Sequence, residues 1–184
     1  TPEQTLFLRK IARRTWAFFD SFVGPQDHWL PPDNYQEYRA VGLAHRTSPT
    51  NMGLALLANL SAYDFGYIPA GVFMEHSANT LRTMVGLKRY HGHFFNWYDT
   101  QSLQPLHPVY VSTVDSGNLV GHLLTLRPAL LSLPDQPILG VRWFQGLHDT
   151  FSVLLDATGG ITPPLLVQFQ QELESICVSL QTAT

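Results

Sequence analysis

The sequence predicts an all-α fold, about half of an (α/α)6 toroid, with about six helices and one inserted β-hairpin. Apolar residues make up 45% of the 184 residues, which is enough for a sizeable core. Apolar side chains recur at three- and four-residue spacings in six segments, as in helices. Segments with one apolar stripe alternate with segments that are apolar nearly all round, and the outer and inner helices of a toroid alternate in this way.

The first two helices flank a long loop. The helix over Pro2–Phe22 carries an apolar stripe and ends at Gly24-Pro25. Ser48 as N-cap and Pro49 at the first helical position begin a helix over Thr50–Phe65, which is apolar nearly all round. The loop between them, Gln26–Thr47, carries four side chains that we expect to pack on the core: Trp29, Leu30, Tyr35 and Tyr38.

A hairpin separates the next two helices. An amphipathic helix is predicted over Val72–Tyr90. Two short strands, Phe94–Asp99 and Leu106–Thr113, follow around a Gln101–Pro105 turn. Ser112 and Asp115 have the spacing of a capping box and open a second all-apolar helix, Asp115–Leu131.

Two helices complete the chain. The first is predicted over Ile138–Leu155, and Gly159-Gly160 ends it. Thr162-Pro163 then caps a last amphipathic helix. Its apolar stripe is Leu166, Phe169, Leu173, Ile176 and Leu180.

The composition excludes several classes of protein. The net charge of −3 and the lack of a basic run argue against a nucleic-acid partner. No apolar run approaches the ~18–20 residues of a membrane span, and the single cysteine, Cys177, excludes an internal disulfide. His91, His93 and His107 lack the acidic neighbour of a tight metal motif, so no metal is expected.

Polar and aromatic side chains gather in the hairpin and at two helix starts. Sugar rings stack on aromatic faces, and their hydroxyls bind fixed donors and acceptors. On a strand, Trp97 and Asp99 face one way and Tyr98 the other. The candidate sugar-binding residues are Arg46, Asn51, Trp97, Tyr98, Asp99, Asp115 and Asn118.

Each of these residues also has a structural interpretation. Arg46 can belong to an ion pair, the hairpin aromatics can be core residues, and Asp115 can stabilise the helix N-terminus. Glycoside chemistry needs a pair of carboxylates, and the sequence does not single out one pair. The carboxylates near the predicted cleft are Asp33, Glu37, Asp99 and Asp115.

Three stretches resemble the cyclic β-1,2-glucan synthases. They are FLRKIARRTWAFFDSFVGPQDHWLPPDNYQE, AHRTSPTNMGLALLANLSAYDFGYI and GLKRYHGHFFNWYDTQSLQPLHPVYVSTVDSGNLVGHLLTL, and the resemblance covers Leu6–Leu133. Members of that family are very large multi-domain proteins of the bacterial inner membrane. They combine a glycosyltransferase region that uses UDP-glucose with a glucoamylase-like transglycosylation region and a phosphorylase-like region.

The resemblance implies that residues 1–184 are a single segment of a helical toroid, excised at the start of the glucoamylase-like region. It places the parent at the cytoplasmic face of the inner membrane, with the segment itself soluble and without a cofactor. In related toroidal glycosidases the hairpin and the following inner helix line the sugar cleft, which points to Trp97, Tyr98, Asp99, Asp115 and Asn118. The catalytic carboxylates are expected beyond Thr184, so no catalytic residue is assigned and the isolated segment is expected to be inactive.

Two functions follow. In the first, the segment supplies sugar-binding walls to a domain that processes β-1,2-glucan, beside the remaining domains of its parent. In the second, it is a non-catalytic helical module that packs between domains of a membrane glycosyltransferase. Both leave apolar faces open on the helices over residues 50–65 and 115–131, and a homodimer through these faces is compatible with either.

Overall fold

A computed structural model describes residues 1–40, 42–137, 140–158 and 163–182. Within these ranges it contains six α-helices and four two-residue strands, which confirms the predicted all-α fold with a small hairpin. The helices are α1 (Pro2–Phe22), α2 (Pro49–Asp64), α3 (Ala70–Gly86), α4 (Thr113–Ser132), α5 (Val141–Ala157) and α6 (Pro164–Thr182). The strands are β1 (Arg46–Thr47), β2 (Arg89–Tyr90), β3 (His93–Phe94) and β4 (Tyr98–Asp99), and short 3-10 turns cover Pro25–Asp27 and Leu133–Asp135.

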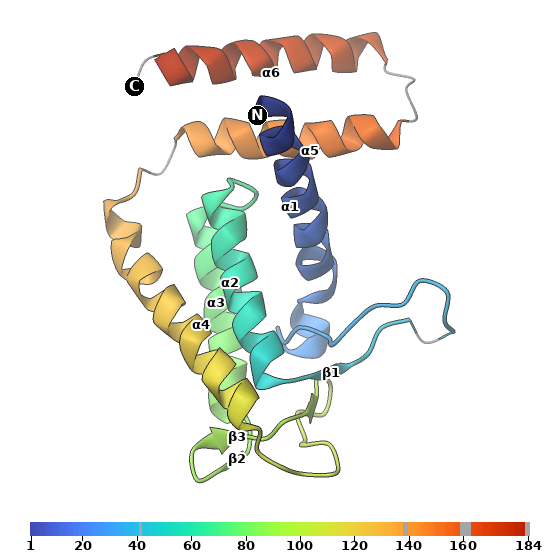
Figure 1. Ribbon diagram of the computed structural model, residues 1–184, viewed down its shortest axis with the longest axis vertical. Coiled ribbons are helices and arrows are strands. Elements are labelled where there is room, and N and C mark those ends of the chain that lie inside the picture. Colours follow the sequence, from blue (N-terminus) through green and yellow to red (C-terminus); the bar gives the residue numbers. More distant parts are fainter. Residues whose placement is uncertain (41, 138–139, 159–162, 183–184) are drawn as a thin grey trace.

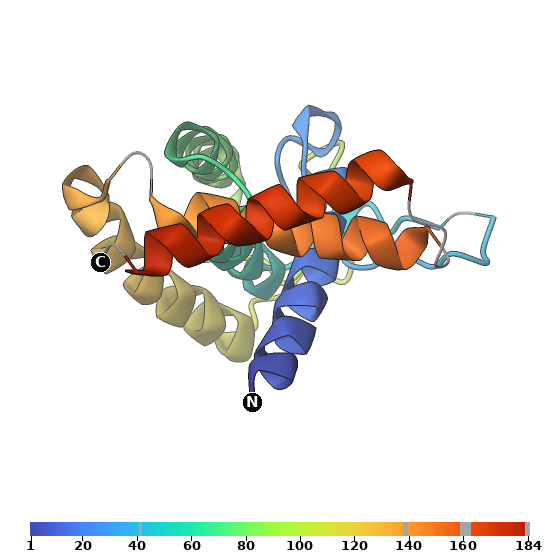
Figure 2. The same ribbon diagram turned by 90° about the horizontal axis from the view of Figure 1, so that it is seen from above.

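Helices α1 to α4 run along the long axis of the molecule, while α5 and α6 lie across one end of them (Figure 1). The view from above shows α6 lying over α5 (Figure 2). Helix α2 packs against α1, α3 and α4, and α5 packs against α1 and α6. The strands and the long loop lie at the end opposite α5 and α6, so the two ends of the molecule differ in character.

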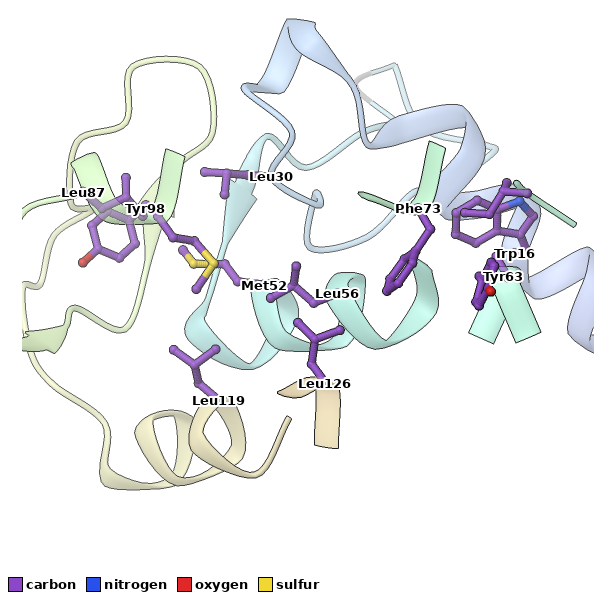
Figure 3. Packing of buried hydrophobic residues seen from close by; sticks show 13 residues of the cluster. Trp16, Leu30, Met52, Leu56, Tyr63, Phe73, Leu87, Tyr98, Leu119 and Leu126 are labelled. Carbon is purple, nitrogen blue, oxygen red and sulfur yellow. The ribbon is translucent and has the colours of Figure 1, made fainter. Parts of the chain in front are cut away.

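Helix α2 forms the centre of the core, as its all-round apolar sequence predicts. Met52 and Leu56 have no exposed surface, and they lie between Leu30 of the long loop and Leu119 and Leu126 of α4 (Figure 3). A helix that packs on three neighbours must be apolar on three sides, which accounts for its sequence pattern.

The long loop packs in part. Leu30 is completely buried and Trp29 is half-buried, as expected. Tyr35 is 46% exposed and packs its ring on Phe22 of α1, with the ring centroids 4.9 Å apart, but Tyr38 is 98% exposed, so its predicted packing is wrong. The reason is that the loop around Tyr38 projects away from the helices (Figure 1). Within it, Gln36 N–H donates to Gly42 C=O (2.7 Å) and Ala44 N–H donates to Asn34 C=O (3.0 Å). These local bonds satisfy the backbone without help from the core.

The structure contains a β-hairpin, but its strands, β2 and β3, lie earlier along the chain than the predicted pair. β2 pairs antiparallel with β3, so α3 ends at Gly86 rather than Tyr90. His91 (φ 47°) and Gly92 (φ 86°) form the connecting two-residue turn, since both adopt the left-handed conformation that suits such hairpins. β4 pairs with β1, and an isolated antiparallel bridge also joins Tyr98 to Pro105 across the predicted Gln101–Pro105 turn. Residues 106–112 are not a strand.

The ends of the remaining helices agree closely with the prediction. α4 begins at Thr113 behind its N-cap, Ser112, and α5 ends at Ala157. The predicted start at Ile138, the Gly159-Gly160 break, the Thr162 cap and the side chain of Leu180 lie outside the described residues. No described helix is long and apolar enough to cross a membrane.

An ion pair, a hydrogen bond and a close glycine contact hold α5 across the bundle. Arg9 of α1 pairs with Asp149 of α5 at 2.8 Å, and Tyr67 donates to the same carboxylate at 3.1 Å. Asp149 has no exposed surface, and loss of either partner would leave a buried carboxylate oxygen with fewer donors. A β-carbon at Gly146 would lie 2.3 Å from the carbonyl oxygen of Gly66, so the backbones touch there.

The predicted open apolar face is present mainly on α4. Among the described residues, the large apolar side chains that α4 exposes are Val114, Val120, Leu124 and Leu131. On α2 the corresponding exposure is that of Leu54, at 46%, because α1 and α3 cover much of its surface.

Helices α2 and α4 approach closely because Gly53 has no side chain. A β-carbon built at Gly53 would lie 2.2 Å from Nδ1 of His122 and 2.9 Å from its Cβ. Rotation of the imidazole relieves the first contact but not the second, so the helices would have to separate.

We expect Gly53→Ala to destabilise the protein by about 1–3 kcal/mol, the usual cost of overpacking, despite the better helix propensity of alanine. Urea unfolding measures the change. Gly121→Ala on α4 is the matched control, because a β-carbon there meets no atom within 4 Å. It should leave stability unchanged or raise it by up to about 1 kcal/mol. Equal effects of the two substitutions would contradict the close approach.

Candidate functional site

The N-termini of α2 and α4 lie side by side at the end of the molecule that carries β1 (Figure 1). Ser48 caps α2 by accepting from Asn51 N–H (3.2 Å), and Ser112 caps α4 by accepting from Asp115 N–H (3.1 Å), as the sequence predicts. The two helix ends and the neighbouring loops bring together a polar cluster that consists of Asp33, Arg46, Thr50, Asn51, Asn96, Asp115 and Asn118.

Thr50 joins the two helix starts. Its hydroxyl donates to Oδ1 of Asp115 (2.7 Å) and accepts from Nδ2 of Asn118 (3.1 Å). Two predicted site residues of α4 are therefore bound to the first turn of α2. Asn118 is exposed, and Asp115 and Thr50 are half-buried, so the group is reachable from solvent.

Asp33 joins the predicted residues Arg46 and Asn51. Nε and Nη2 of Arg46 donate to Oδ2 of Asp33 at 3.1 and 2.8 Å, and Nδ2 of Asn51 donates to Oδ1 at 3.4 Å. The guanidinium also lies over the ring of Trp97, 4.9 Å from its centroid. Arg46 thus forms the ion pair of the structural interpretation and at the same time places a cation on the predicted aromatic platform.

Asp115 is held as a carboxylate. Burial alone would raise its pKa, but hydrogen bonds from Ser112, Thr50 and Ser48 outweigh burial, so the pKa lies below its ordinary value. The group therefore acts as a fixed acceptor at neutral pH rather than as an acid.

The expected alternation along β4 separates Trp97 from Tyr98. Trp97 is half-buried at the polar cluster. Tyr98 has no exposed surface, and its hydroxyl accepts from Phe95 N–H (2.8 Å) and donates to Lys88 C=O (2.6 Å). Tyr98 is thus a core residue in this structure, and its assignment to the cleft is corrected, because a fully buried phenol has no surface to offer a ligand.

Asp99 organises a turn. Its Oδ1 accepts from the backbone N–H groups of Gln101 (3.1 Å) and Ser102 (2.7 Å) and from the Ser102 hydroxyl (2.8 Å). The Ser102 backbone bond is the largest of the effects that lower the pKa of Asp99. Asp99 lies opposite Arg46 in the β1–β4 pairing, which places its turn beside the polar cluster.

The cluster lies on an open surface. A small cavity of about 120 Å³ touches it at Asp33 and Asn51. Two larger grooves, of about 540 and 580 Å³, lie far from it, the first between α5 and α6 and the second among α1, α5 and α6. Within the described residues, no group of three or more His, Cys, Asp or Glu side chains is placed to hold a metal ion.

Sequence reasoning missed the connecting role of two residues. Thr50 bridges the helices, and its position directly after Ser48-Pro49 at a helix start was the available signal. Asn96 contacts both Trp97 and Asp115, and nothing in the local sequence marks it, because its partners come from other parts of the chain.

Comparison with known proteins finds a relative in sequence and several solved structures of similar fold. No family model matches the chain. The cyclic β-(1,2)-glucan synthase NdvB of Rhizobium meliloti is 43% identical over 151 residues, which is 82% of this chain and 5% of that protein. The chain therefore spans one small part of this relative.

The fold matches solved structures of proposed glucoamylases from Bacteroides fragilis (TM-score 0.57) and Bacteroides caccae (TM-score 0.55). Each match covers 67% of this chain, at 18% identity, and 30% or 31% of the other chain. At this identity the likeness establishes a glucoamylase-like helical fold and nothing further.

The Asp99 turn predicts a pH-dependent contribution to stability. Because the folded-state pKa of Asp99 is below its ordinary value of about 3.9, the contribution is complete above that pH and is lost as pH falls through the lowered value. Asp99→Asn should lower the free energy of unfolding near neutral pH by up to about 1 kcal/mol, since solvent screens this partly exposed group.

Urea unfolding of both proteins at about pH 7 and about pH 2.5 measures the difference. The difference between the two unfolding free energies should be smaller at the lower pH. Asp135→Asn, which changes an exposed carboxylate elsewhere, is the control. A gap of the same size at both pH values would show that the charge of Asp99 does not stabilise the turn.

Proposed function

Because the chain is homologous to one segment of the cyclic β-(1,2)-glucan synthases, we propose that it belongs to a glucan-processing protein. In this proposal it supplies sugar-binding walls to a glucoamylase-like transglycosylation domain that handles β-1,2-glucan. The glucoamylase-like fold supports the assignment to that kind of domain. Catalytic residues are not assigned to this chain.

The observation that carries the proposal is the position of Trp97 beside fixed polar groups. The indole is half-buried, so part of its surface is open, and Arg46 covers one face at 4.9 Å. A glucosyl ring stacked on open indole surface would find nearby acceptors and donors for its hydroxyls in Asp115 and Asn118. Neutral, hydroxyl-rich ligands suit such a site, because Arg46 is already paired with Asp33 and the Asp115 carboxylate can accept hydrogen bonds from hydroxyls.

The partners of the segment follow from the same proposal. The parent would use UDP-glucose in a separate glycosyltransferase region and act at the cytoplasmic face of the bacterial inner membrane. The exposed apolar side chains of α4, including Val120 and Leu124, would contact further helices of the toroid. Alternatively, a second copy of the chain would cover these side chains in a homodimer.

A non-catalytic interaction module is the second candidate function. It is favoured by the exposed apolar face of α4 and by the internal hydrogen bonds that already occupy the polar cluster. The two candidates differ in one respect that is easily measured, because only the first requires glucan to contact Trp97 and Asp115.

Calorimetric titration of linear and cyclic β-1,2-glucans, with cellooligosaccharide as the control ligand, tests the proposal. We expect the protein to bind β-1,2-glucan selectively. Trp97→Ala and Asp115→Asn should each weaken binding about tenfold, which corresponds to the loss of about 1.4 kcal/mol from stacking or from a charged hydrogen bond.

Tyr38→Ala and Asp135→Asn are matched controls that remove an exposed aromatic ring and an exposed carboxylate away from the cluster, and neither should change binding. Circular dichroism confirms that each variant is folded. Absence of glucan binding, or binding that is equally strong in all four variants, would reject the sugar-binding wall and favour the interaction module.

A further inference from the structure

Asn96 is a polar residue in a nearly closed environment. Its side chain lies among the hairpin, the N-terminus of α4 and the segment that precedes α4, and only 7% of the residue is exposed. A buried amide without partners is costly, so such a residue is retained only where its donors and acceptor are used.

Its neighbours fix the orientation of the amide. The indole N–H of Trp97 can only donate, and the carboxylate of Asp115 can only accept. The amide oxygen of Asn96 therefore accepts from Nε1 of Trp97 (2.6 Å) and from the Tyr110 hydroxyl (2.7 Å), while its nitrogen donates to Oδ2 of Asp115 (2.8 Å).

The backbone reinforces this arrangement. Asn96 N–H donates to Tyr110 C=O at 2.8 Å, and Leu106 N–H donates to Trp97 C=O at 2.9 Å. The backbone on both sides of the Asn96–Trp97 peptide is thus tied to residues 106–110, which lead into α4. One side-chain amide connects the edge of the indole ring to the carboxylate at the helix start.

We infer that Asn96 is a positioning residue, which holds the Trp97 ring and the Asp115 carboxylate in one fixed relative orientation. Asn96 need not touch a ligand itself. With Arg46 over one face of the ring and Asn96 at its edge, the indole can offer a ligand only the remaining surface. The consequence of this orientation for glucan binding rests on the proposed function. The connection of Trp97 to Asp115 through Asn96 can be measured without any ligand.

Two substitutions distinguish the hydrogen bond that Asn96 accepts from Trp97 from the one that it donates to Asp115. Asn96→Ala removes both, so the indole N–H of Trp97 should exchange with solvent at least tenfold faster and the pKa of Asp115 should rise by about one unit, as expected when a carboxylate loses a donor. Asn96→Asp keeps the acceptor for Trp97 but places a second carboxylate against Asp115. Indole exchange should then stay unchanged, while one carboxyl of the pair titrates at higher pH.

Nuclear magnetic resonance gives both readouts in the ligand-free protein, with the indole signal assigned from Trp97→Phe. Asn79→Ala is the control, because that amide lies on α3 and accepts from Arg82. The exchange variant Asn96→Asp/Asp115→Asn should regain the bond, since the amide introduced on α4 would donate to the carboxylate introduced at position 96. If Asn96→Ala does not fold, the exchange variant still tests the hydrogen bond between positions 96 and 115.

The outcomes are distinct from those of the proposed function. Unchanged indole exchange and unchanged Asp115 titration in folded Asn96→Ala, or a carboxyl at position 96 of the exchange variant that titrates as high as the raised carboxyl of Asn96→Asp, would overturn the inference. If the unaltered protein binds no glucan, the proposed function fails while the spectroscopic result on Asn96 stands. If glucan binds and Asn96→Ala moves both readouts, binding should weaken about fivefold, and unchanged affinity would overturn the positioning role for that ligand.

Discussion

Helices α2 and α4 meet where Gly53 lies against the side chain of His122, and this contact leaves no room for a β-carbon. Close packing at that point brings the first turns of both helices together, so the Thr50 hydroxyl reaches Asp115 at 2.7 Å. The hairpin and the long loop then attach to these helix starts through Asn96 and Asp33. A wider spacing of the two helices would separate the members of the polar cluster without altering any of them.

The polar cluster joins two helix starts and leaves some of its groups open to solvent. Helix N-termini carry N–H groups without partners in the helix, and side-chain oxygens of Ser48, Ser112 and Asp115 compensate for them. Such groups must lie where helices begin, and in this fold two helices begin at the same surface. The structural and the sugar-binding interpretations of Asp115 therefore describe one arrangement, because a carboxylate held ionised for the helix is also a fixed acceptor.

The sequence predicts those parts of the fold that depend on local signals. Ser48 and Ser112 mark two helix starts correctly, and the all-round apolar pattern of α2 identifies the central helix. The exact hairpin was missed, because His91-Gly92 was not recognised as its turn, although a glycine with positive φ suits that position. Contacts between distant residues, such as Arg9 with Asp149 and Asn96 with Asp115, leave no local pattern and could not be predicted.

The pairing of β1 with β4 joins residues that lie far apart along the chain, with Arg46 opposite Asp99. Thr50 and Asp115 are separated by 65 positions. Closing loops of this length costs entropy before any contact repays it, whereas α2 and α3 are neighbours along the chain and can pair early. The packing of α2 on α4 spans a similar separation, so a partly folded chain that holds α2 against α3 would lack both the packing of α4 on the core and the polar cluster, which form in the same step.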